Sequence, residues 1–408
     1  MHLAKNHNIP GLDIEVKNFN FATVVQHELD LVAKLREEKY EKVLLQLENV
    51  THIEGKASFV SPDEIDVNGQ TYQAKKLIIA AGSTATVPPI ENIQEVGYLT
   101  HIEALQIKNL PKELIVVGAG PLGLEFAQMY SRFGTKVTVL QRSDSIFPPA
   151  EKELTDRLAE ILTNEGITIK TNAQVKSARK EAGKKVLIIM IAGQEEQIIT
   201  DEILLATGKT PNTKELNLNK AGVNVDDKLA IKVTPEFQTS QPHIFAVGDV
   251  TNLPIREEPT AGKEGTLAAE NALNNTKNSI DYNSVPWTIF TDPQLAGVGL
   301  TEEQEMNQLG RCLCRTVSFA DVPKAIIMNR TEGLIKMAVH PDTKVILGIQ
   351  ILAPNAGELI AQAMWLVKNK STIDDVVNSL PMFPTLSETI KIAALSFTKD
   401  ISKLSCCV

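Results

Sequence analysis

Two groups of residues have types and spacings that could do chemistry. Gly118, Gly120 and Gly123 form a GxGxxG pattern, and Cys406 and Cys407 are adjacent near the end of the 408-residue chain. In a GxGxxG turn the first glycine permits a tight turn, the second lets a pyrophosphate approach the backbone, and the third packs helix against strand. Thiolates are soft ligands that select soft metal ions. The sequence therefore predicts a dinucleotide site and a soft-metal site.

The elements around the glycines are those that a dinucleotide site requires. Residues 113–117 form an apolar run typical of a buried strand, a helix is expected from Leu122 to about Phe133, and residues 136–140 predict a second strand. The N-terminus of such a helix offers free N–H groups and a positive dipole end to phosphate. The alternative is a glycine-rich turn in an α/β protein that binds no nucleotide.

The end of the second predicted strand bears on the choice of cofactor. NAD-binding proteins usually carry Asp or Glu there for the ribose 2′-hydroxyl, whereas arginine suits the 2′-phosphate of NADP. This chain has Gln141 and Arg142. We therefore expect NADPH to be preferred, with NADH possible, and both residues to contact the nucleotide. The alternative is that Arg142 is a solvated loop residue.

A third motif lies at residues 244–249, where an apolar strand ends in Gly248 and Asp249. This arrangement would place a carboxylate beside closely approaching backbone, which suits a hydroxyl of a sugar or polyol. A turn with an Asx cap is the equally good alternative.

The other two cysteines, Cys312 and Cys314, alternate on a predicted strand, so both should face the same side. We interpret them as packing residues, with metal binding as the less favoured alternative. Four cysteines are too few for a secreted disulfide scaffold and suit a reducing cytosol. We therefore expect a cytoplasmic protein.

Composition excludes several classes of protein. The net charge is -9 and the acidic and basic residues are mixed along the chain, which argues against a nucleic-acid partner. No apolar run reaches the roughly 18 residues of a membrane span, and no signal peptide is evident, so we expect no membrane partner. The length predicts about two to four domains.

Outside the glycine turn, the residue pattern predicts helices and strands along most of the chain. One helix is expected within 13–48, and Asn68 and Gly69 predict a hairpin turn between 64–67 and 70–73. Further strands are expected at 77–80, 167–170, 185–191, 202–206, 244–247, 311–319, 333–339 and 345–353, and further helices at 262–274, 357–369 and 385–397.

The order of these motifs resembles the pyridine nucleotide–disulfide oxidoreductase family over essentially the whole chain. Gly82 lies in a segment similar to the family's turn between the flavin and nicotinamide domains. Gly208 lies in 206–212, which resembles the A-T-G-x-x-P-N segment beside the nicotinamide. The resemblance implies that Asp249 binds the ribityl chain of FAD and that Ala261 belongs to the same site.

The resemblance also implies the fold. It predicts an α/β protein with two nucleotide-binding three-layer domains, for FAD and NAD(P), and a C-terminal α+β dimerisation domain. The expected FAD-binding domain comprises 1–110 and 231–285, the NAD(P)-binding domain 111–230, and the dimerisation domain 286–408 with its Cys-Cys tail. A homodimer is expected, because in this family the dimerisation domain completes the partner's active site.

Within the family, residues 290–294, 321–325, 356–360 and 404–407 resemble mercuric reductases. This implies that Cys406 and Cys407 receive Hg(II), or another soft metal ion, in near-linear coordination. It also implies that Glu125 positions the nicotinamide side of the flavin. The alternatives are a chance cysteine pair and a surface glutamate.

The sequence departs from the family pattern in two respects. Phe383 stands where many members have a proton-transferring histidine, which leaves the candidate catalytic Glu388 without its usual neighbour. The chain also begins at what resembles the segment after the family's first GxGxxG and CxxxxC motifs. We therefore expect a truncated FAD- and NADPH-dependent reductase of Hg(II) to Hg(0). The alternative is a catalytically inactive, dimeric remnant that binds NAD(P)H, and soft metal through its terminal cysteines.

Overall fold

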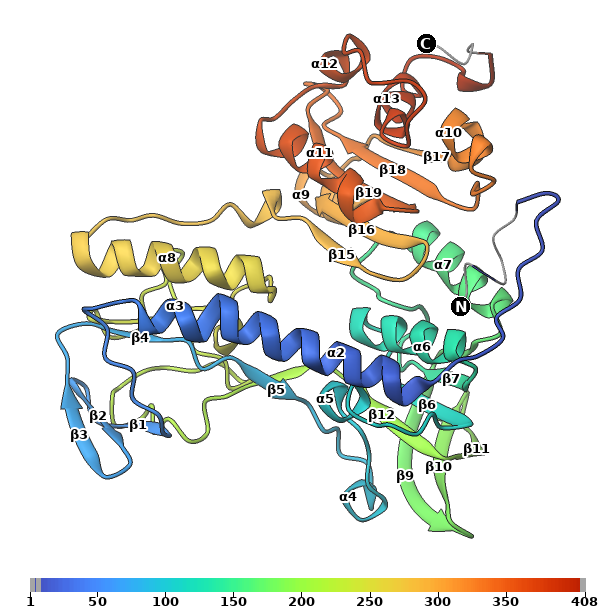
Figure 1. Cartoon of the computed structure of the whole chain (residues 1–408). Helices are drawn as coiled ribbons and strands as arrows, with labels where there is room; N and C mark the ends of the chain where they lie inside the picture. Colours follow the sequence, from blue (N-terminus) through green and yellow to red (C-terminus); the bar gives the residue numbers. More distant parts are fainter. Residues whose placement is uncertain (1–3, 5–8, 404–408) are drawn as a thin grey trace. The chain divides into compact units, whose positions relative to one another are not determined.

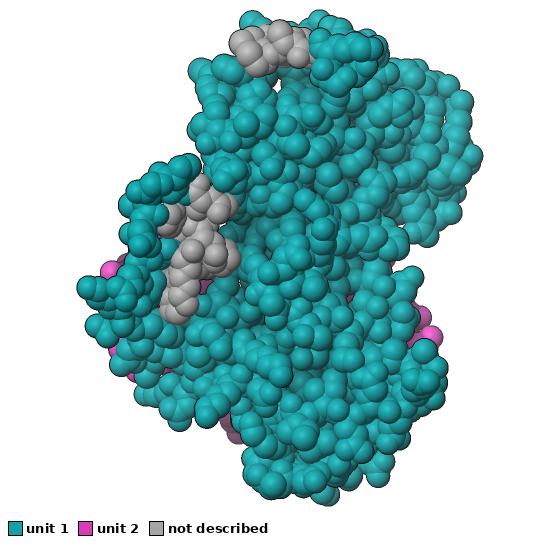
Figure 2. Space-filling view, turned by 90° about the vertical axis from the view of Figure 1, so that its right-hand side faces the viewer, with its two compact units in different colours: residues 1–22, 87–207, 283–408 teal, residues 23–86, 208–282 magenta. Residues whose placement is uncertain are grey.

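The computed structural model describes residue 4 and residues 9–403, and the chain divides into two compact units. Unit 1 comprises residues 1–22, 87–207 and 283–408, and unit 2 comprises residues 23–86 and 208–282 (Figures 1 and 2). The mixture of helices and strands confirms the expected α/β fold class. Among the described residues, no helix is both long enough and apolar enough to cross a membrane.

Unit 1 contains a parallel sheet built from the predicted βαβ segment. Its strand order is β12-β6-β7-β8, from Glu202–Leu205, Glu113–Val117, Lys136–Leu140 and Thr168–Lys170. Helix α6 (Pro121–Phe133) connects β6 to β7, and α7 (Lys152–Asn164) leads to β8. Strands β6 and β12 are nearly continuous apolar runs because both faces of a parallel sheet are normally covered.

A second, antiparallel sheet of unit 1 was only partly expected. Its order is β11-β10-β9, from Gln194–Thr200, Lys184–Ile191 and Ala173–Glu181. Only β10 corresponds to a predicted strand. Two short helices, α4 (Ile93–Val96) and α5 (His101–Ala104), precede β6 in the chain.

The C-terminal part of unit 1 is built around a five-stranded antiparallel sheet of order β15-β16-β19-β18-β17. The strands are Trp287–Ile289, Gln294–Gly299, Ile346–Ala353, Leu334–Val339 and Cys314–Ser318, of which the first two were not predicted. The helices are α9 (Glu302–Leu309), α10 (Pro323–Ile327), α11 (Ala356–Lys368), α12 (Ile373–Val377) and α13 (Glu388–Leu395). Helix α11 packs against β16 and β19 (Figure 1).

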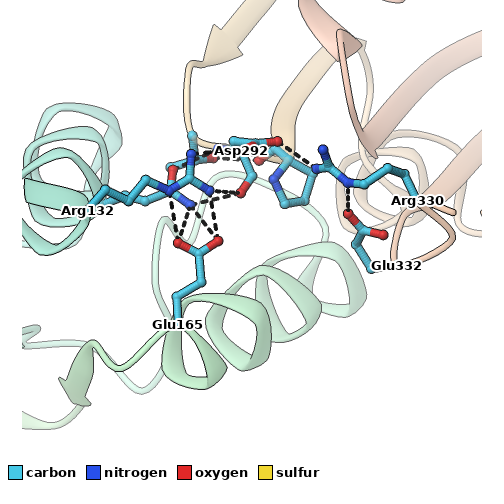
Figure 3. Close-up of polar contacts among 8 residues, drawn as sticks. Arg132, Glu165, Asp292, Arg330 and Glu332 are labelled. Carbon is cyan, nitrogen blue, oxygen red and sulfur yellow. Dashed lines mark hydrogen bonds and ion pairs between the residues drawn. The ribbon is translucent and has the colours of Figure 1, made fainter. Parts of the chain in front are cut away.

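An ion cluster ties the end of α6 to the start of this C-terminal part. The Arg132 guanidinium lies 2.8 Å from Glu165 and 3.2 Å from the carboxylate of Asp292, whose other oxygen lies 2.6 Å from Arg330 (Figure 3). Arg330 also pairs with Glu332 at 2.6 Å. The arginine side chains are only 20% and 24% exposed, so the pairs are partly shielded from water.

Unit 2 contains the predicted hairpin. Strands β1 (Ala57–Ser61), β2 (Glu64–Val67) and β3 (Gln70–Gln73) form an antiparallel sheet, and Asn68 and Gly69 make the turn with φ of 55° and 84°. Two further sheets have two strands each: β14 (Ile244–Ala246) lies parallel to β4 (Leu77–Ile79), and β13 (Lys209–Pro211) lies antiparallel to β5 (Ser83–Ala85).

The helices of unit 2 differ in extent from the prediction. Helix α2 begins at Phe21, not near residue 13, and runs to Arg36, followed by a π-helical turn (Glu37–Glu41) and α3 (Lys42–Leu45). Before α2, Phe19 stacks on Phe133 at 5.2 Å between ring centroids, so this segment is held by aromatic packing within unit 1. Helix α8 spans Glu258–Asn274, slightly more than expected.

Candidate functional site

The glycine turn between β6 and α6 has the geometry that each glycine position requires. Gly118 has φ of +108°, and a Cβ there would overlap the carbonyl oxygen of Ala206. A Cβ on Gly123 would overlap the carbonyl oxygen of Gly118. Residues with side chains are therefore excluded at the first and third positions by packing within the protein.

The second glycine differs, because nothing in the protein fills the space beside it. Gly120 is the N-terminal cap of α6, Pro121 is the first helical residue, and a Cβ on Gly120 would meet no atom within 4 Å. This open space lies against free N–H groups at a helix N-terminus, where a phosphate binds favourably. The turn therefore fits the pyrophosphate of a dinucleotide.

Gln141 supports this turn from the end of β7. Its Oε1 accepts a hydrogen bond from the Ala119 N–H at 3.0 Å, and its Nε2 donates to Ser143 Oγ at 2.5 Å and to the Ser145 carbonyl at 3.3 Å. The sequence predicted that Gln141 contacts the nucleotide directly. In the structure, the oxygen and the nitrogen of its side-chain amide both form hydrogen bonds within the protein. Gln141 therefore supports the turn, a role that spacing alone did not indicate.

Arg142, the next residue, is exposed and makes no ion pair with any residue in the described part of the chain. Its guanidinium is therefore available to an anion. An exposed arginine beside the glycine turn suits a 2′-phosphate, and the same exposure matches the alternative of a solvated loop residue.

Unit 2 brings Gly82, Ser83 and Asp249 together. Ser83 Oγ donates to Asp249 Oδ2 at 2.6 Å, and Gly82 takes φ of +65°. Asn212 fixes this turn by donating its N–H to the Gly82 carbonyl at 3.0 Å and its Nδ2 to the Ala81 carbonyl at 2.9 Å. Within residues 9–403, Asp249 Oδ1 makes no hydrogen bond, so one carboxylate oxygen is available to a ligand hydroxyl.

A buried glutamate supports the neighbouring Gly248. Glu264 is fully buried, accepts from the Gly248 N–H at 2.7 Å and accepts from the Tyr282 hydroxyl at 2.8 Å. Burial raises the pKa of Glu264 despite these two donors. A Cβ on Gly248 would lie 3.3 Å from that of Ala261, so the predicted site residue Ala261 packs against this turn. No motif or spacing in the sequence pointed to Glu264.

Gly208 completes the unit 2 residues that were predicted to form a site. It has φ of +100°, and its carbonyl accepts from the Thr86 N–H at 2.9 Å, next to the pairing of β13 with β5. The arrangement fits the polyol end of a flavin, because it combines a free carboxylate oxygen with glycine backbone. The 408 residues contain one GxGxxG pattern, and it belongs to unit 1.

The two candidate catalytic carboxylates have separate main-chain partners. Glu125 Oε1 on α6 accepts from the Phe290 N–H at 2.7 Å, and burial raises its pKa although this hydrogen bond opposes the shift. Glu388 is 8% exposed and accepts from the Thr385 N–H at 3.0 Å. No hydrogen bond joins the two carboxylates, and Phe383 is 43% exposed.

The cysteines fall into two cases. Cys406 and Cys407 lie outside the described residues. Cys312 and Cys314 do face one side, but the interpretation as packing residues is wrong: their Sγ atoms lie 3.3 Å from Glu302 and 3.5 Å from Glu305, and neither belongs to an apolar core. Both are free thiols.

Comparison with known proteins identifies the family. Residues 5–276 match the model of the pyridine nucleotide-disulphide oxidoreductase family, and residues 285–394 match the model of its dimerisation domain. The chain is similar to a mercuric reductase from Staphylococcus aureus, at 36% identity over 405 residues that cover 99% of this chain and 74% of that protein. For a mercuric reductase from Bacillus cereus the identity is 34%, covering 100% of this chain and 64% of the relative.

Two further comparisons show how broad the similarity is. A dihydrolipoyl dehydrogenase from Thermus scotoductus is 36% identical over 363 residues, which cover 88% of this chain and 77% of that protein. Among solved structures, the HOCl-induced flavoprotein disulfide reductase RclA from Escherichia coli superposes with a TM-score of 0.85 at 27% identity, covering 98% of this chain and 88% of that one. From the family models, these relatives and the shared fold we conclude that the chain belongs to the pyridine nucleotide-disulphide oxidoreductase family and is close to its mercuric reductases.

Proposed function

We propose that the protein is an FAD-dependent oxidoreductase that uses NADPH to reduce Hg(II) to Hg(0). The observation that carries the proposal is the open space beside Gly120 at the N-terminus of α6, in a chain similar to mercuric reductases over nearly its whole length. The reaction balances as NADPH plus Hg(II) giving NADP⁺, Hg(0) and one proton, with two electrons transferred. The family implies FAD and NAD(P)H, and the preference for NADPH is part of the proposal.

The residues of unit 1 would bind the nicotinamide nucleotide. Main-chain N–H groups after Gly120 would donate to the pyrophosphate, and Gln141 would hold the turn in shape through the Ala119 N–H. Arg142 would pair with the 2′-phosphate, which NADH lacks. Glu125, whose raised pKa reflects its burial, would position the nicotinamide side of the flavin.

The residues of unit 2 would bind the flavin. Asp249 Oδ1 would accept from a ribityl hydroxyl, while Ser83 holds Oδ2. Gly82 and Gly208 would allow close approach of the ring system, and Ala261 would pack behind Gly248. When bound, FAD supplies the ability to accept a hydride and pass on its two electrons.

The metal ion is the substrate in this proposal, and Cys406 and Cys407 would bind it. Two thiolates suit a soft ion, and reduction of a metal ion needs no proton at the metal. The reaction therefore needs no proton-transferring side chain at position 383, where Phe383 has no group that could transfer a proton. Glu388 would act as a positioning residue for the segment that contains Thr385.

We further propose a homodimer in the cytoplasm. The dimerisation-domain match supports the homodimer, as do large apolar side chains exposed in the C-terminal part of unit 1, among them Leu380 at 95% and Met382 at 76%. Free thiols at Cys312 and Cys314 suit a reducing compartment. Light scattering of the purified protein would give the mass of the assembly.

The test is the visible spectrum of the purified protein, before and after NADPH is added without oxygen. A flavin band at about 450 nm that bleaches would support electron transfer from NADPH to FAD. NADPH oxidation should then depend on Hg(II) and fall in the Cys406→Ser/Cys407→Ser variant, while bleaching by NADPH is unchanged. A colourless protein that still binds NADPH would overturn the proposal in favour of the inactive, soft-metal-binding alternative.

A further inference from the structure

Outside the proposed site, two thiols and two carboxylates of unit 1 meet. Helix α9 places Glu302 and Glu305 three residues apart, so both lie on one helix face. Cys312 and Cys314 flank Leu313 at the start of β17, so both thiols point away from the core against which Leu313 packs. The turn at Gly310, with φ of +71°, brings the helix face and the strand face together.

The distances within this cluster approach those of a metal site. One ligand atom each of Glu302, Cys312 and Cys314 lies within 4.8 Å of the other two. The Sγ of Cys312 is 3.3 Å from Glu302 Oε1, and that of Cys314 is 3.5 Å from Glu305 Oε2. In a tetrahedral zinc site with bonds of about 2.3 Å to sulfur and about 2.1 Å to oxygen, neighbouring ligand atoms are about 3.6 Å apart. Small side-chain movements would therefore suffice.

Charge and burial also favour a cation. Glu305 is fully buried and makes no ion pair with any residue among 9–403; it accepts only from the Leu313 N–H and the Cys314 thiol. Three further carboxylates, on Glu151, Glu153 and Glu302, surround the single Lys336 ammonium at 2.5 to 3.2 Å. The cluster thus carries more negative than positive charge. A divalent cation bound by two thiolates would leave the net charge of the cluster unchanged, because the two thiols lose two protons when they bind it.

We propose that Cys312, Cys314 and Glu302, with Glu305 as a fourth ligand, form a binding site for a zinc-type divalent cation. Two sulfur and two oxygen ligands in tetrahedral arrangement suit Zn(II) and its spectroscopic substitute Co(II). A cavity of about 340 Å³ lies beside the cluster, lined by both cysteines, Glu153, Glu302 and Lys336 among others, so an ion can enter. The site is distinct from Cys406 and Cys407 and does not depend on the proposed reaction.

Binding should strengthen as pH rises. Burial and the neighbouring glutamates raise the pKa of both thiols, so the ion must displace two protons. Affinity would then change by up to about 100-fold per pH unit below the thiol pKa values. The titratable and charged groups around the cysteines come from the N-terminal end of α7, from α9, β17 and β18, and from the loop after β18: Glu151, Glu153, Glu302, Glu305, Arg315, Lys336 and His340.

The chain permits a clean test, because its four cysteines form two separable pairs. Co(II) would be titrated into the full chain carrying Cys406→Ser/Cys407→Ser, and absorption from thiolate-to-cobalt charge transfer measured. We expect one equivalent of bound Co(II), displaced by Zn(II), and none once Cys312→Ser/Cys314→Ser is added. Glu302→Gln should weaken binding by about tenfold or more, whereas Glu303→Gln, an exposed neighbour on α9, should not.

A second measurement avoids variants altogether. Zn(II) should protect Cys312 and Cys314 of the unmodified chain from alkylation, as read by mass spectrometry of the peptide that contains them. The proposal is overturned if the tail-free variant binds no Co(II), if binding survives loss of Cys312 and Cys314, or if Zn(II) leaves their alkylation unchanged. If the two thiols only donate hydrogen bonds to Glu302 and Glu305, the tail-free variant would bind no Co(II) and Zn(II) would leave the alkylation unchanged.

Discussion

The guanidinium of Arg132 on α6 binds both the side-chain carboxylate and the main-chain carbonyl of Asp292. Its Nη1 lies 3.2 Å from Asp292 Oδ2, and its Nη2 donates to the Asp292 carbonyl at 3.1 Å (Figure 3). Gln128, one turn earlier, exchanges two hydrogen bonds of 2.8 Å with the same main chain. This relationship fixes the segment before β16 to helix α6, which covers the parallel sheet of unit 1.

Asp292→Asn should lower the stability of unit 1 by about 1–3 kcal/mol, since it removes the partly buried carboxylate that Arg132 and Arg330 share and leaves each guanidinium with a single glutamate partner. Thermal unfolding followed by circular dichroism would measure the loss. The same change at exposed Asp321 is the matched control and should shift the midpoint little. Equal midpoints for the two variants would contradict the role assigned to the cluster.

The contribution of Asp292 should also depend on pH. Burial alone would raise the pKa of Asp292, but Arg330 and Arg132 outweigh burial and hold that pKa below its ordinary value. The carboxylate therefore stabilises the fold fully above about pH 4, and this stabilisation is lost as pH falls through the lower folded-state pKa. The difference between the wild-type and Asp292→Asn midpoints should shrink on acidification. A difference that grew would show that the sign is wrong.

Two alanine substitutions in the glycine turn should affect different properties, one the affinity for NADPH and the other the thermal stability. Gly120→Ala meets open space and should leave the thermal midpoint unchanged, but its methyl group would occupy the space proposed for the pyrophosphate. NADPH affinity should fall by about tenfold or more, which is 1.4 kcal/mol per tenfold. Gly123→Ala would instead collide with the Gly118 carbonyl and lower the midpoint.

Fluorescence titration with NADPH, together with thermal unfolding, separates these effects. If Gly120→Ala bound NADPH as well as the wild type, the turn would not be the nucleotide site.

Arg142→Gln should weaken the binding of NADPH by about tenfold and leave the affinity for NADH unchanged, because only NADPH carries the 2′-phosphate. Dissociation constants for both nucleotides, measured at one salt concentration, check this. NADH serves as the internal control for folding. Equal losses for both nucleotides would assign Arg142 to another part of the cofactor, and no loss would make it a solvated loop residue.

Glu264 should give the opposite pH dependence to Asp292. Its pKa is raised by burial, so the folded protein holds the proton more tightly than the unfolded chain does. This stabilisation is present below about pH 4.3 and is lost as pH rises through the folded-state pKa. Glu264→Gln does not titrate, so its midpoint should rise relative to wild type over that window. The control is Glu270→Gln, an exposed change on the same helix.

The parallel sheet of unit 1 could be predicted from the sequence because its signals are local. Residues 113–117 and 136–140 are apolar runs bounded by turn residues, and the strands have these bounds in the structure. Strands β9 and β11 could not be predicted in this way. Their exposed faces are rich in Lys, Arg, Glu and Gln, and they are strands because both pair with β10.

The candidate sites show the same division. Alternation along the chain correctly placed Cys312 and Cys314 on one side, but the carboxylates that face them come from a helix whose approach depends on the fold. Likewise, the GxGxxG spacing located the turn, whereas the support from Gln141 depends on where β7 ends. The predicted binding and catalytic roles of all the candidate site residues stay predictions: Gly82, Gly118, Gly120, Gly123, Glu125, Gln141, Arg142, Gly208, Asp249, Ala261, Glu388, Cys406 and Cys407.

The pairing of β5 with β13 has a consequence for how the protein is made. These strands, with the Thr86-to-Gly208 hydrogen bond, join the two points where residues 87–207 leave and re-enter unit 2. During synthesis β4 cannot pair until β14 has been made, roughly 170 residues later. Closing so long a loop in an unfolded chain is entropically costly. If the intervening segment folds first, it shortens that loop before the ribosome delivers the partner strand. Unit 2 would therefore be completed after residues 87–207 have folded, with β4 and β5 unpaired and exposed to chaperones in the interval.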